Sequence, residues 1–315
     1  MRAAARGACR SLSTAAPPPP LSMADKVRAF GSLLGTGLAS GALGGLVGLG
    51  AHGSPIMVPA LKSMAKHSAA TATGTAAVAV VSTGLAGCLG FATAGSFEPS
   101  KGMFGKIEVF TAVMTGVGAA IGSRIGTPLA SKLNPQLLQR SFGVVQLVLA
   151  PLVLYKPIYD KRVKEEAEQR KKLLRKSTTV ISWGKTYTDA YTTVGRFAEA
   201  AGRSPPIGLA AGTIFGVLGV GGGVVIAPCL CLLTNLDHAT VLGTTLAAML
   251  PASAMTALSH WRAGSVCMYS AVPLVLATAA GGYYGSKLAV DLPEEQTKTL
   301  FAATIFGLGV RRLML

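Results

Sequence analysis

Long apolar stretches separated by short polar ones dominate this chain. Each stretch covers roughly 17–25 residues, the length that an α-helix needs to cross the hydrocarbon layer of a membrane. The windows are 29–50, 68–92, 107–130, 137–155, 206–233, 238–259, 267–290 and 297–313. The pattern therefore predicts an all-α, polytopic membrane protein with about eight membrane segments.

The charged residues gather at the N-terminus and in a central stretch over 156–204. This distribution predicts two membrane repeats, at 27–155 and 205–315, joined by a polar charged linker. The linker is rich in Lys, Glu, Arg and Gln, which favours a solvated helix; a lipid- or partner-binding helix is the alternative. By the positive-inside rule, this basic stretch should face the matrix, stroma or cytosol.

A glycine-dense phrase occurs once in each half. It runs over 41–53 and again over 212–223, and a proline follows each copy at Pro59 and Pro228. Other landmarks recur in the same order, namely Gly74-Thr75 with Gly243-Thr244, Gly95-Ser96 with Gly264-Ser265, and Gly122-Ser123-Arg124 with Gly285-Ser286-Lys287. The chain is therefore predicted to consist of two homologous halves, each with a glycine-broken helix.

The consecutive glycines of the second copy are the leading candidate for a substrate site. Such a run should unwind, and unwound backbone at membrane depth survives only inside protein or beside a wet cavity. Its N–H groups and the start of the next half-helix would suit an anion, although close helix packing is the alternative role of glycine. The predicted substrate-binding glycines are Gly219, Gly221, Gly222 and Gly223, with Gly48, Gly50 and Gly53 in the first copy, where Ala51-His52 interrupts the run.

Threonines in the next apolar segment of each half are predicted to complete the site. Thr75, Thr244 and Thr245 could offer hydroxyls to a substrate, or return hydrogen bonds to their own helix backbone. Arg124 and Lys287 hold matched positions, where they would supply positive charge at the mouth of the pathway or snorkel to the membrane interface. In the first glycine phrase, the histidine at position 52 is a candidate for proton coupling.

Composition excludes several other classes of protein. The chain has 315 residues, 50% of them hydrophobic and 13% charged, with a mean hydropathy of +0.50, which is typical of a membrane protein. Membrane orientation explains the net charge of +16 without nucleic acid, because no aromatic-interleaved basic face occurs. Neither the five cysteines nor the four histidines show metal-ligand spacing. The sequence predicts no metal, no cofactor and no enzyme activity.

Residues 1–26 are predicted to be an organelle transit peptide. Arg2, Arg6 and Arg10 recur every four residues among many Ala, Ser and Thr, and no acidic residue precedes Asp25. A secretory signal fits less well because no apolar core precedes the tetraproline. The expected location is an organelle membrane, with the mitochondrial inner membrane favoured and a plastid or another membrane as alternatives.

Several of these motifs together carry a family resemblance. They are the second glycine phrase with Pro228, then Gly243-Thr244-Thr245, Gly264 and Gly285, all repeated upstream. In this combination the chain resembles the sulfite exporter TauE/SafE family of membrane permeases, over about 27–155 and 205–315. The resemblance implies an all-helical permease of two homologous halves that moves sulfite, sulfonates or related small anions.

Two topologies fit the apolar pattern. If each glycine phrase crosses the membrane fully, each half has about four crossings and the halves are parallel; a re-entrant hairpin leaves about three and makes them inverted. Loop charges favour the parallel arrangement, whereas the prolines that follow the glycines favour the hairpin.

The leading functional hypothesis is anion transport by alternating access, with the substrate near the membrane midplane between the two repeats. Its partners would be a small inorganic or organic anion and the lipid bilayer, without nucleic acid. The alternative is a non-transporting membrane scaffold, or a translocase-like assembly subunit whose glycines only pack helices.

Overall fold

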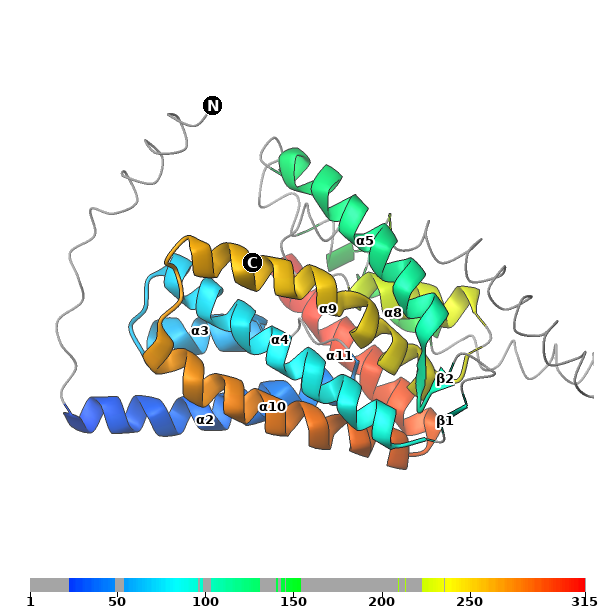
Figure 1. The fold of residues 1–315 in the computed structure, drawn as a ribbon, viewed down its shortest axis with the longest axis horizontal. Helices are drawn as coiled ribbons and strands as arrows, with labels where there is room; N and C mark the ends of the chain where they lie inside the picture. Colours follow the sequence, from blue (N-terminus) through cyan, green and yellow to red (C-terminus); the bar gives the residue numbers. More distant parts are fainter. Residues whose placement is uncertain are drawn as a thin grey trace, which may run out of the picture.

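The protein is a bundle of helices in the computed structural model (Figure 1). The structure describes residues 23–48, 54–95, 97–98, 103–130, 140, 143–144, 146–153, 209, 213, 223–234 and 236–314. Its helices are α2 (Met23–Leu46), α3 (Ser54–Ser63), α4 (Ala69–Thr93), α5 (Val109–Ala130), α8 (Gly223–Leu233), α9 (His238–Arg262), α10 (Met268–Asp291) and α11 (Glu294–Met314). Strands β1 (Phe97–Glu98), β2 (Met103–Phe104) and β3 (Ile107–Glu108) pair antiparallel in that order. The predicted helical class is confirmed, and the number of crossings stays a prediction.

Hydrophobicity located the long helices well. The windows at 68–92, 238–259 and 267–290 agree closely with α4, α9 and α10. Within the described part of the chain, α4 and α9 are long and apolar enough to cross a membrane, and Phe30–Leu46 and Val109–Gly122 are shorter apolar helical stretches. The windows missed α3, which follows the first glycine phrase as a separate helix of 10 residues.

Apolar side chains cover the outside of the bundle. Leu85 and Leu89 of α4, Val113 and Val117 of α5, and Leu276 of α10 are each more than half exposed. A soluble protein rarely presents such continuous apolar surface, whereas a helix that faces lipid requires it. The exposed faces of these helices therefore suit a membrane.

Glycines hold α2 and α10 together along a close seam. A Cβ atom on Gly41 would lie 2.4 Å from the carbonyl oxygen of Thr278, and one on Gly45 would lie 2.3 Å from that of Gly282. Gly285 of α10 faces α2 in the same way. Only glycine permits backbones to approach so closely, so Gly41 and Gly45 of the phrase serve helix packing.

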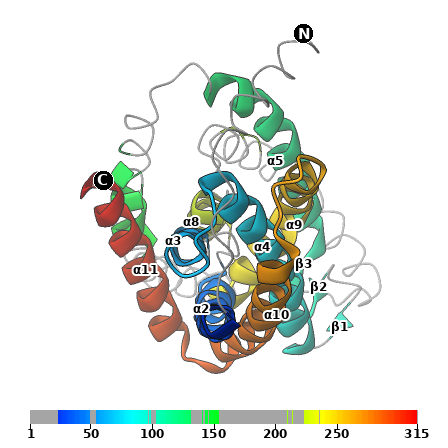
Figure 2. The ribbon, with the colours of Figure 1, turned by 90° about the vertical axis from the view of Figure 1, so that its left-hand side faces the viewer.

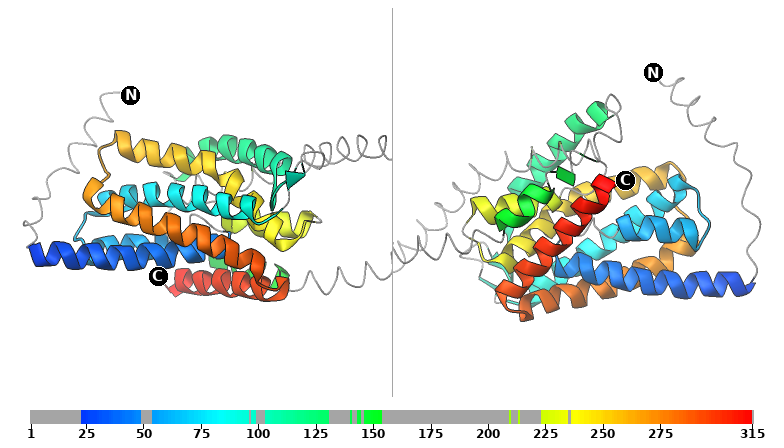
Figure 3. Two further views of the ribbon diagram at one scale, coloured as in Figure 1. Left: turned by 60° about the horizontal axis from the view of Figure 1, so that its bottom comes forward. Right: turned by 180° about the vertical axis from the view of Figure 1, so that it is seen from behind.

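The helices matched in sequence run in opposite directions. Gly74 of α4 faces Ser265, just beyond the end of α9, whereas Gly87 of α4 faces Leu246 near the start of α9. Figures 1 and 3 show α4 and α10 running one way and α9 the other. Opposite directions agree with the inverted arrangement and contradict the parallel one that loop charges favoured. The short helix α8 contributes to this reversal, because it lies between α4 and α9 in the chain and turns the chain back just before α9 begins.

Candidate functional site

Each glycine phrase is followed by a short helix that leads into a long one. The helix α3 packs on α4 through Met57 and Leu61, which are fully buried beside Ala72 and Ala76. In the other half, α8 packs on α9 in a second buried cluster, which includes Ile226, Leu230, Leu242 and Leu246. A loop of a few residues joins each short helix to its long partner. Each pair therefore forms a helical hairpin.

The N-termini of the two short helices point toward each other. Because α4 and α9 are antiparallel, the hairpin loops lie at opposite ends of the bundle, and α3 and α8 both begin inside it. At about 1.5 Å per residue, they rise roughly 15–17 Å, against roughly 37 Å for α4 and α9. Figure 2, which looks along the bundle, shows both short helices toward its middle. Two partial positive charges thus converge near mid-depth, which is an environment suited to an anion.

The first glycine phrase turns the chain at Gly48. The helix α2 ends at Leu46, and Gly48 has a φ of 64°, a conformation that other residues rarely adopt. A Cβ there would also lie 2.6 Å from the Cβ of Leu242 in α9. In the second phrase, Gly223 is the first residue of α8. The predicted site glycines Gly50, Gly53, Gly219, Gly221 and Gly222, together with His52, lie outside the described residues.

Two of the predicted site threonines each hold the loop of the other half. The Oγ1 of Thr75 accepts a hydrogen bond from the N–H of Cys267, at 3.1 Å, just before α10. The Oγ1 of Thr244 accepts one from the N–H of Glu108, at 3.0 Å, just before α5. Both hydroxyls are fully buried. Each therefore satisfies a backbone donor at the start of a helix, where the intrahelical ladder offers no acceptor.

The glycine before each of these threonines makes the matching contact. A Cβ on Gly74 would lie 2.2 Å from the carbonyl oxygen of Ser265, and one on Gly243 would lie 2.4 Å from that of Lys106. Ser265 stands two residues before Cys267, as Lys106 stands two residues before Glu108. The Gly-Thr pairs thus form the same contact twice, once at each end of the bundle.

The loops that receive these contacts correct one predicted match. Gly105 and Gly264 open the two loops with φ values of 61° and 66°, so Gly105 is the counterpart of Gly264 in the structure. The predicted match of Gly95 with Gly264 is wrong, because the β1–β2 hairpin inserts residues into the first half alone. Periodicity gave no sign of so short a hairpin.

The other predicted site residues show ordinary local contacts. The Thr245 hydroxyl donates to the carbonyl oxygen of Val241 in its own helix at 2.7 Å. The Nζ of Lys287 lies 4.9 Å from the ring centroid of Tyr283, a cation–π distance. Arg124 lies in α5, and its side chain is outside the described part. Their roles toward a substrate stay predictions.

Comparison with known proteins identifies the family. The model of the sulfite exporter TauE/SafE family matches residues 5–153 and 172–314. The chain belongs to the TauE/SafE family. The family resemblance noted from the glycine motifs is therefore confirmed.

One curated relative of this TauE/SafE member is the probable membrane transporter protein YdhB of Bacillus subtilis (strain 168). It is 34% identical over 95 residues, which are 30% of this chain and 39% of the relative. The matched segment thus spans well under half of that protein. No solved structure matches the chain.

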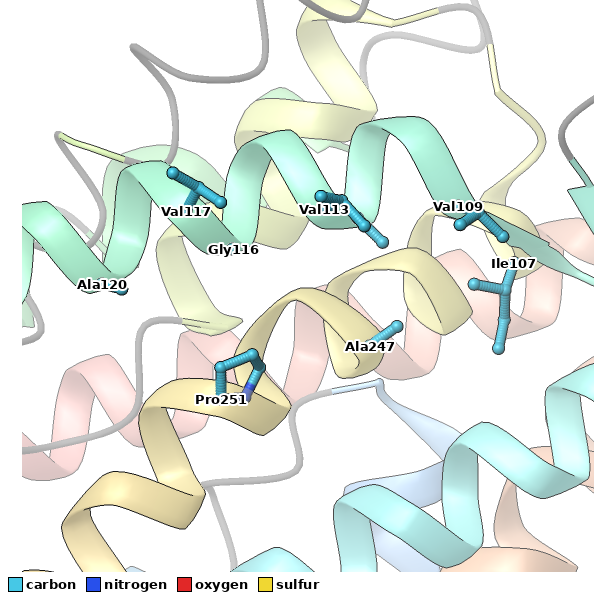
Figure 4. Close-up of a pocket in the computed structure, with 9 residues that line it drawn as sticks. Ile107, Val109, Val113, Gly116, Val117, Ala120, Ala247 and Pro251 are labelled. Atoms are coloured by element: carbon cyan, nitrogen blue, oxygen red, sulfur yellow. The ribbon is translucent and has the colours of Figure 1, made fainter.

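Two pockets in the described part of this TauE/SafE member have no residue of α3 or α8 in their lining. One, of about 340 Å³, lies between α5 and α9 and is lined by apolar residues such as Val113, Val117 and Pro251 (Figure 4). Such a lining offers no hydrogen bonds to an anion. The other, of about 200 Å³, is polar and includes Lys106 and Asp237. Within the described residues, no group of three His, Cys, Asp or Glu side chains could hold a metal ion.

Sequence reasoning missed the polar residues around Thr244. Glu108 is buried and accepts a hydrogen bond from the Thr111 hydroxyl at 2.8 Å, and Lys106 pairs with Asp237 at 3.1 Å. Burial alone would raise the pKa of Asp237, but hydrogen bonds from Thr240 and Lys106 outweigh it, so that the pKa lies below its ordinary value. A signal for Glu108 was present, since it is an acid inside the predicted apolar window 107–130.

Proposed function

We propose that this TauE/SafE member is a permease or exporter for small anions, with sulfite, sulfonates and related sulfur oxyanions as its substrate class. The observation that carries the proposal is the convergence of the N-termini of α3 and α8 inside an apolar bundle. Helix N-termini supply unpaired N–H groups and partial positive charge, which bind anions without a buried cation. The matching family and its description as a sulfite exporter support this substrate class.

The substrate lies between the two glycine turns, near the membrane midplane. In this proposal, backbone N–H groups of Gly219, Gly221, Gly222 and Gly223 bind the anion from one side, and those of Gly48, Gly50 and Gly53 bind it from the other. The hydroxyl protons of Thr75 and Thr244, whose oxygens accept loop N–H groups, complete the ligand set, and the Thr245 hydroxyl joins them when it turns away from the carbonyl oxygen of Val241. Arg124 and Lys287 supply positive charge at the mouths.

Transport proceeds by alternating access between two inverted repeats, 27–155 and 205–315. The opposite directions of α4 and α9 and the two Gly-Thr contacts support this arrangement. In such a transporter each half rocks against the other around a fixed site, so that one end closes as the other opens. The Gly-Thr contacts, one at each end, are suited to act as the points where the halves meet.

Flux in liposomes tests the proposal. The purified chain should carry at least one of sulfite, thiosulfate, sulfate and methanesulfonate, and Gly222→Leu should lower that flux at least about tenfold, because the side chain fills the space at the N–H groups. Gly307→Leu is the control, since a Cβ there meets nothing within 4 Å. Equal transport by Gly222→Leu and the parent would exclude the proposed site.

A membrane scaffold or translocase-like subunit is the competing function. The seam between α2 and α10 fits a scaffold as well as a permease. A scaffold would co-purify with protein partners and show no flux of any anion in the panel. It would leave the two converging half-helices without a role.

The membrane is proposed to be that of an organelle, with the mitochondrial inner membrane favoured over a plastid or another membrane. Residues 1–26 lie largely outside the described part, and the proposal rests on their arginine spacing and lack of acids. A fluorescent protein placed after residues 1–26 should accumulate in mitochondria. Fluorescence in the cytosol would contradict the proposed targeting to an organelle.

A further inference from the structure

A polar pocket lies at the end of the bundle where α9 begins. Its volume is about 200 Å³, and it lies between the loop before α5, the start of α9 and the corner between α10 and α11. Its polar lining residues are Lys106, Asp237, His238, Glu294 and Thr297. The pocket is separate from the converging N-termini of α3 and α8, because it lies beside the opposite end of α8.

One lining side chain, His238, is buried with an unpartnered nitrogen. The residue is 1% exposed, and its ring meets the edge of Phe301 in α11 at 5.3 Å between centroids. Its Nδ1 lies 4.0 Å from the Sγ of Cys231 in α8. Its Nε2 has no hydrogen-bond partner in the described part of the chain. A buried polar atom without a partner is costly, so its retention calls for a role.

Two ion pairs surround this imidazole. Asp237 pairs with Lys106 at 3.1 Å, and Glu294 pairs with Lys298 at 2.8 Å. Hydrogen bonds hold the pKa of both carboxyls below their ordinary values, Lys298 being the main donor to Glu294. From α8 the titratable neighbour is Cys231, and α10 contributes only apolar residues to the pocket. The site therefore presents two carboxylates and two ammonium groups around one imidazole.

We propose that His238 binds the proton that is coupled to anion movement, an inference that rests on the proposed permease function. Water enters the pocket, and when the lining opens onto the buried Nε2 the proton passes from hydronium to that nitrogen. One O–H bond breaks, one N–H bond forms on the lone pair of Nε2, and the imidazolium carries the positive charge. The proton then offsets one negative charge of the substrate.

In the tautomer that carries the ring proton on Nδ1, protonation converts Nε2 from an acceptor into a donor, which needs an acceptor that the observed arrangement does not supply. The nearby carboxylates are those of Asp237 and Glu294, and each is engaged by a lysine. If Asp237 turns to the imidazolium, it releases Lys106. That ion pair joins the loop of the first half to the start of α9 in the second, so a proton on His238 loosens the contact between the halves at this end.

The helix α8 connects this event to the substrate. Cys231, near the C-terminal end of α8, touches the imidazole, while Gly223 opens the same helix at the proposed anion site. A shift at one end of a short helix moves the other end with it. The bound proton and the bound anion therefore both act on the position of α8, and a shared element of this kind is required for coupling between two sites.

The test compares His238→Gln with the parent in proteoliposomes. Glutamine is uncharged and can still hydrogen-bond, so it keeps the pocket polar. Sulfate and methanesulfonate are the probes, because neither changes its charge near neutral pH and any dependence on protons then belongs to the protein. A pH gradient should drive anion uptake by the parent. In His238→Gln the rate of this uptake should fall at least about tenfold, while the rate of anion exchange without a gradient should stay within about twofold of the parent rate.

His67→Gln is the matched control, because His67 lies at the other end of the bundle, with its Nε2 already 2.7 Å from the Ser270 hydroxyl. It should keep the gradient-driven uptake. The proposal is wrong if His238→Gln takes up anion along the pH gradient as fast as the parent does. It is also wrong if this variant loses anion exchange as strongly as it loses gradient-driven uptake, because His238 would then have a structural role. If anion flux in the parent does not depend on the pH gradient, the proton coupling is wrong but the permease function stands. If the parent transports neither probe, nor sulfite, nor thiosulfate, the permease function is wrong as well.

Discussion

Gly285→Leu should leave little folded protein. A Cβ at this position would lie 2.2 Å from the carbonyl oxygen of Ala42 and 2.9 Å from its Cα, and a backbone cannot rotate away as a side chain can. The helices α2 and α10 would have to separate, which breaks the neighbouring contacts of Gly41 and Gly45. Overpacking of this kind costs about 1–3 kcal/mol or more, a large part of the stability of most proteins. Monodisperse protein after detergent extraction should fall to a small fraction of the parent.

Gly307→Leu is again the matched control, because both changes replace a helical glycine by the same strong helix former. Position 307 has open space around it, so intrinsic propensity alone acts there and stability should stay equal or rise. If Gly285→Leu matches the control in its yield of monodisperse protein and in its melting temperature, α2 and α10 do not pack as closely as described.

Hydrophobicity alone gave the positions of the long helices, because a membrane demands an unbroken apolar stretch of fixed length. It gave neither their directions nor the helix that decides them. The separate helix α8 lay inside the single apolar window 206–233, yet it turns the chain back before α9, which runs antiparallel to α4. Loop charges favoured the parallel arrangement because they were counted without that reversal.

The candidate site was predictable in kind but not in detail. The glycine phrases drew attention to the starts of α3 and α8, since glycine runs and prolines have a direct effect on backbone conformation. Side-chain partners depend on residues distant in sequence, which no local pattern contains. Thr75 therefore looked like a substrate ligand, and its contact with Cys267, 192 positions away, was not foreseen.

The two Gly-Thr contacts also explain why matched residues in the two halves need not serve the substrate directly. Each threonine holds the start of a long helix from the other half, and removal of either hydroxyl leaves an N–H unpaired, which is buried at Glu108 and half-buried at Cys267. In a transporter whose two halves rotate against each other, contacts of this kind determine where the halves touch.

Thr244→Val should destabilise the protein, whereas Thr245→Val should not. Valine keeps the shape of threonine but removes the acceptor, so the N–H of Glu108 is left unpaired in a buried site, at a cost of about 1–3 kcal/mol. Within the described residues the Thr245 hydroxyl bonds only to the carbonyl oxygen of Val241, which stays in the helical ladder, so loss of this hydroxyl costs little. The apparent melting temperature in one detergent measures both, and Thr244→Ser, which restores the hydroxyl, should recover most of the loss.

Thr75→Val should also destabilise the protein, by no more than Thr244→Val does, because it leaves the half-buried N–H of Cys267 unpaired in the equivalent contact. The two sites lie toward opposite ends of the bundle and share no partner, so the losses in the double variant should add to within about 0.5 kcal/mol. A double variant that loses much less stability than the sum of the single losses would mean that the two contacts act as one unit.

Equal melting temperatures for Thr244→Val and Thr245→Val would show that the hydroxyl of Thr244 does not hold the loop. The threonines would then be free to serve the substrate alone.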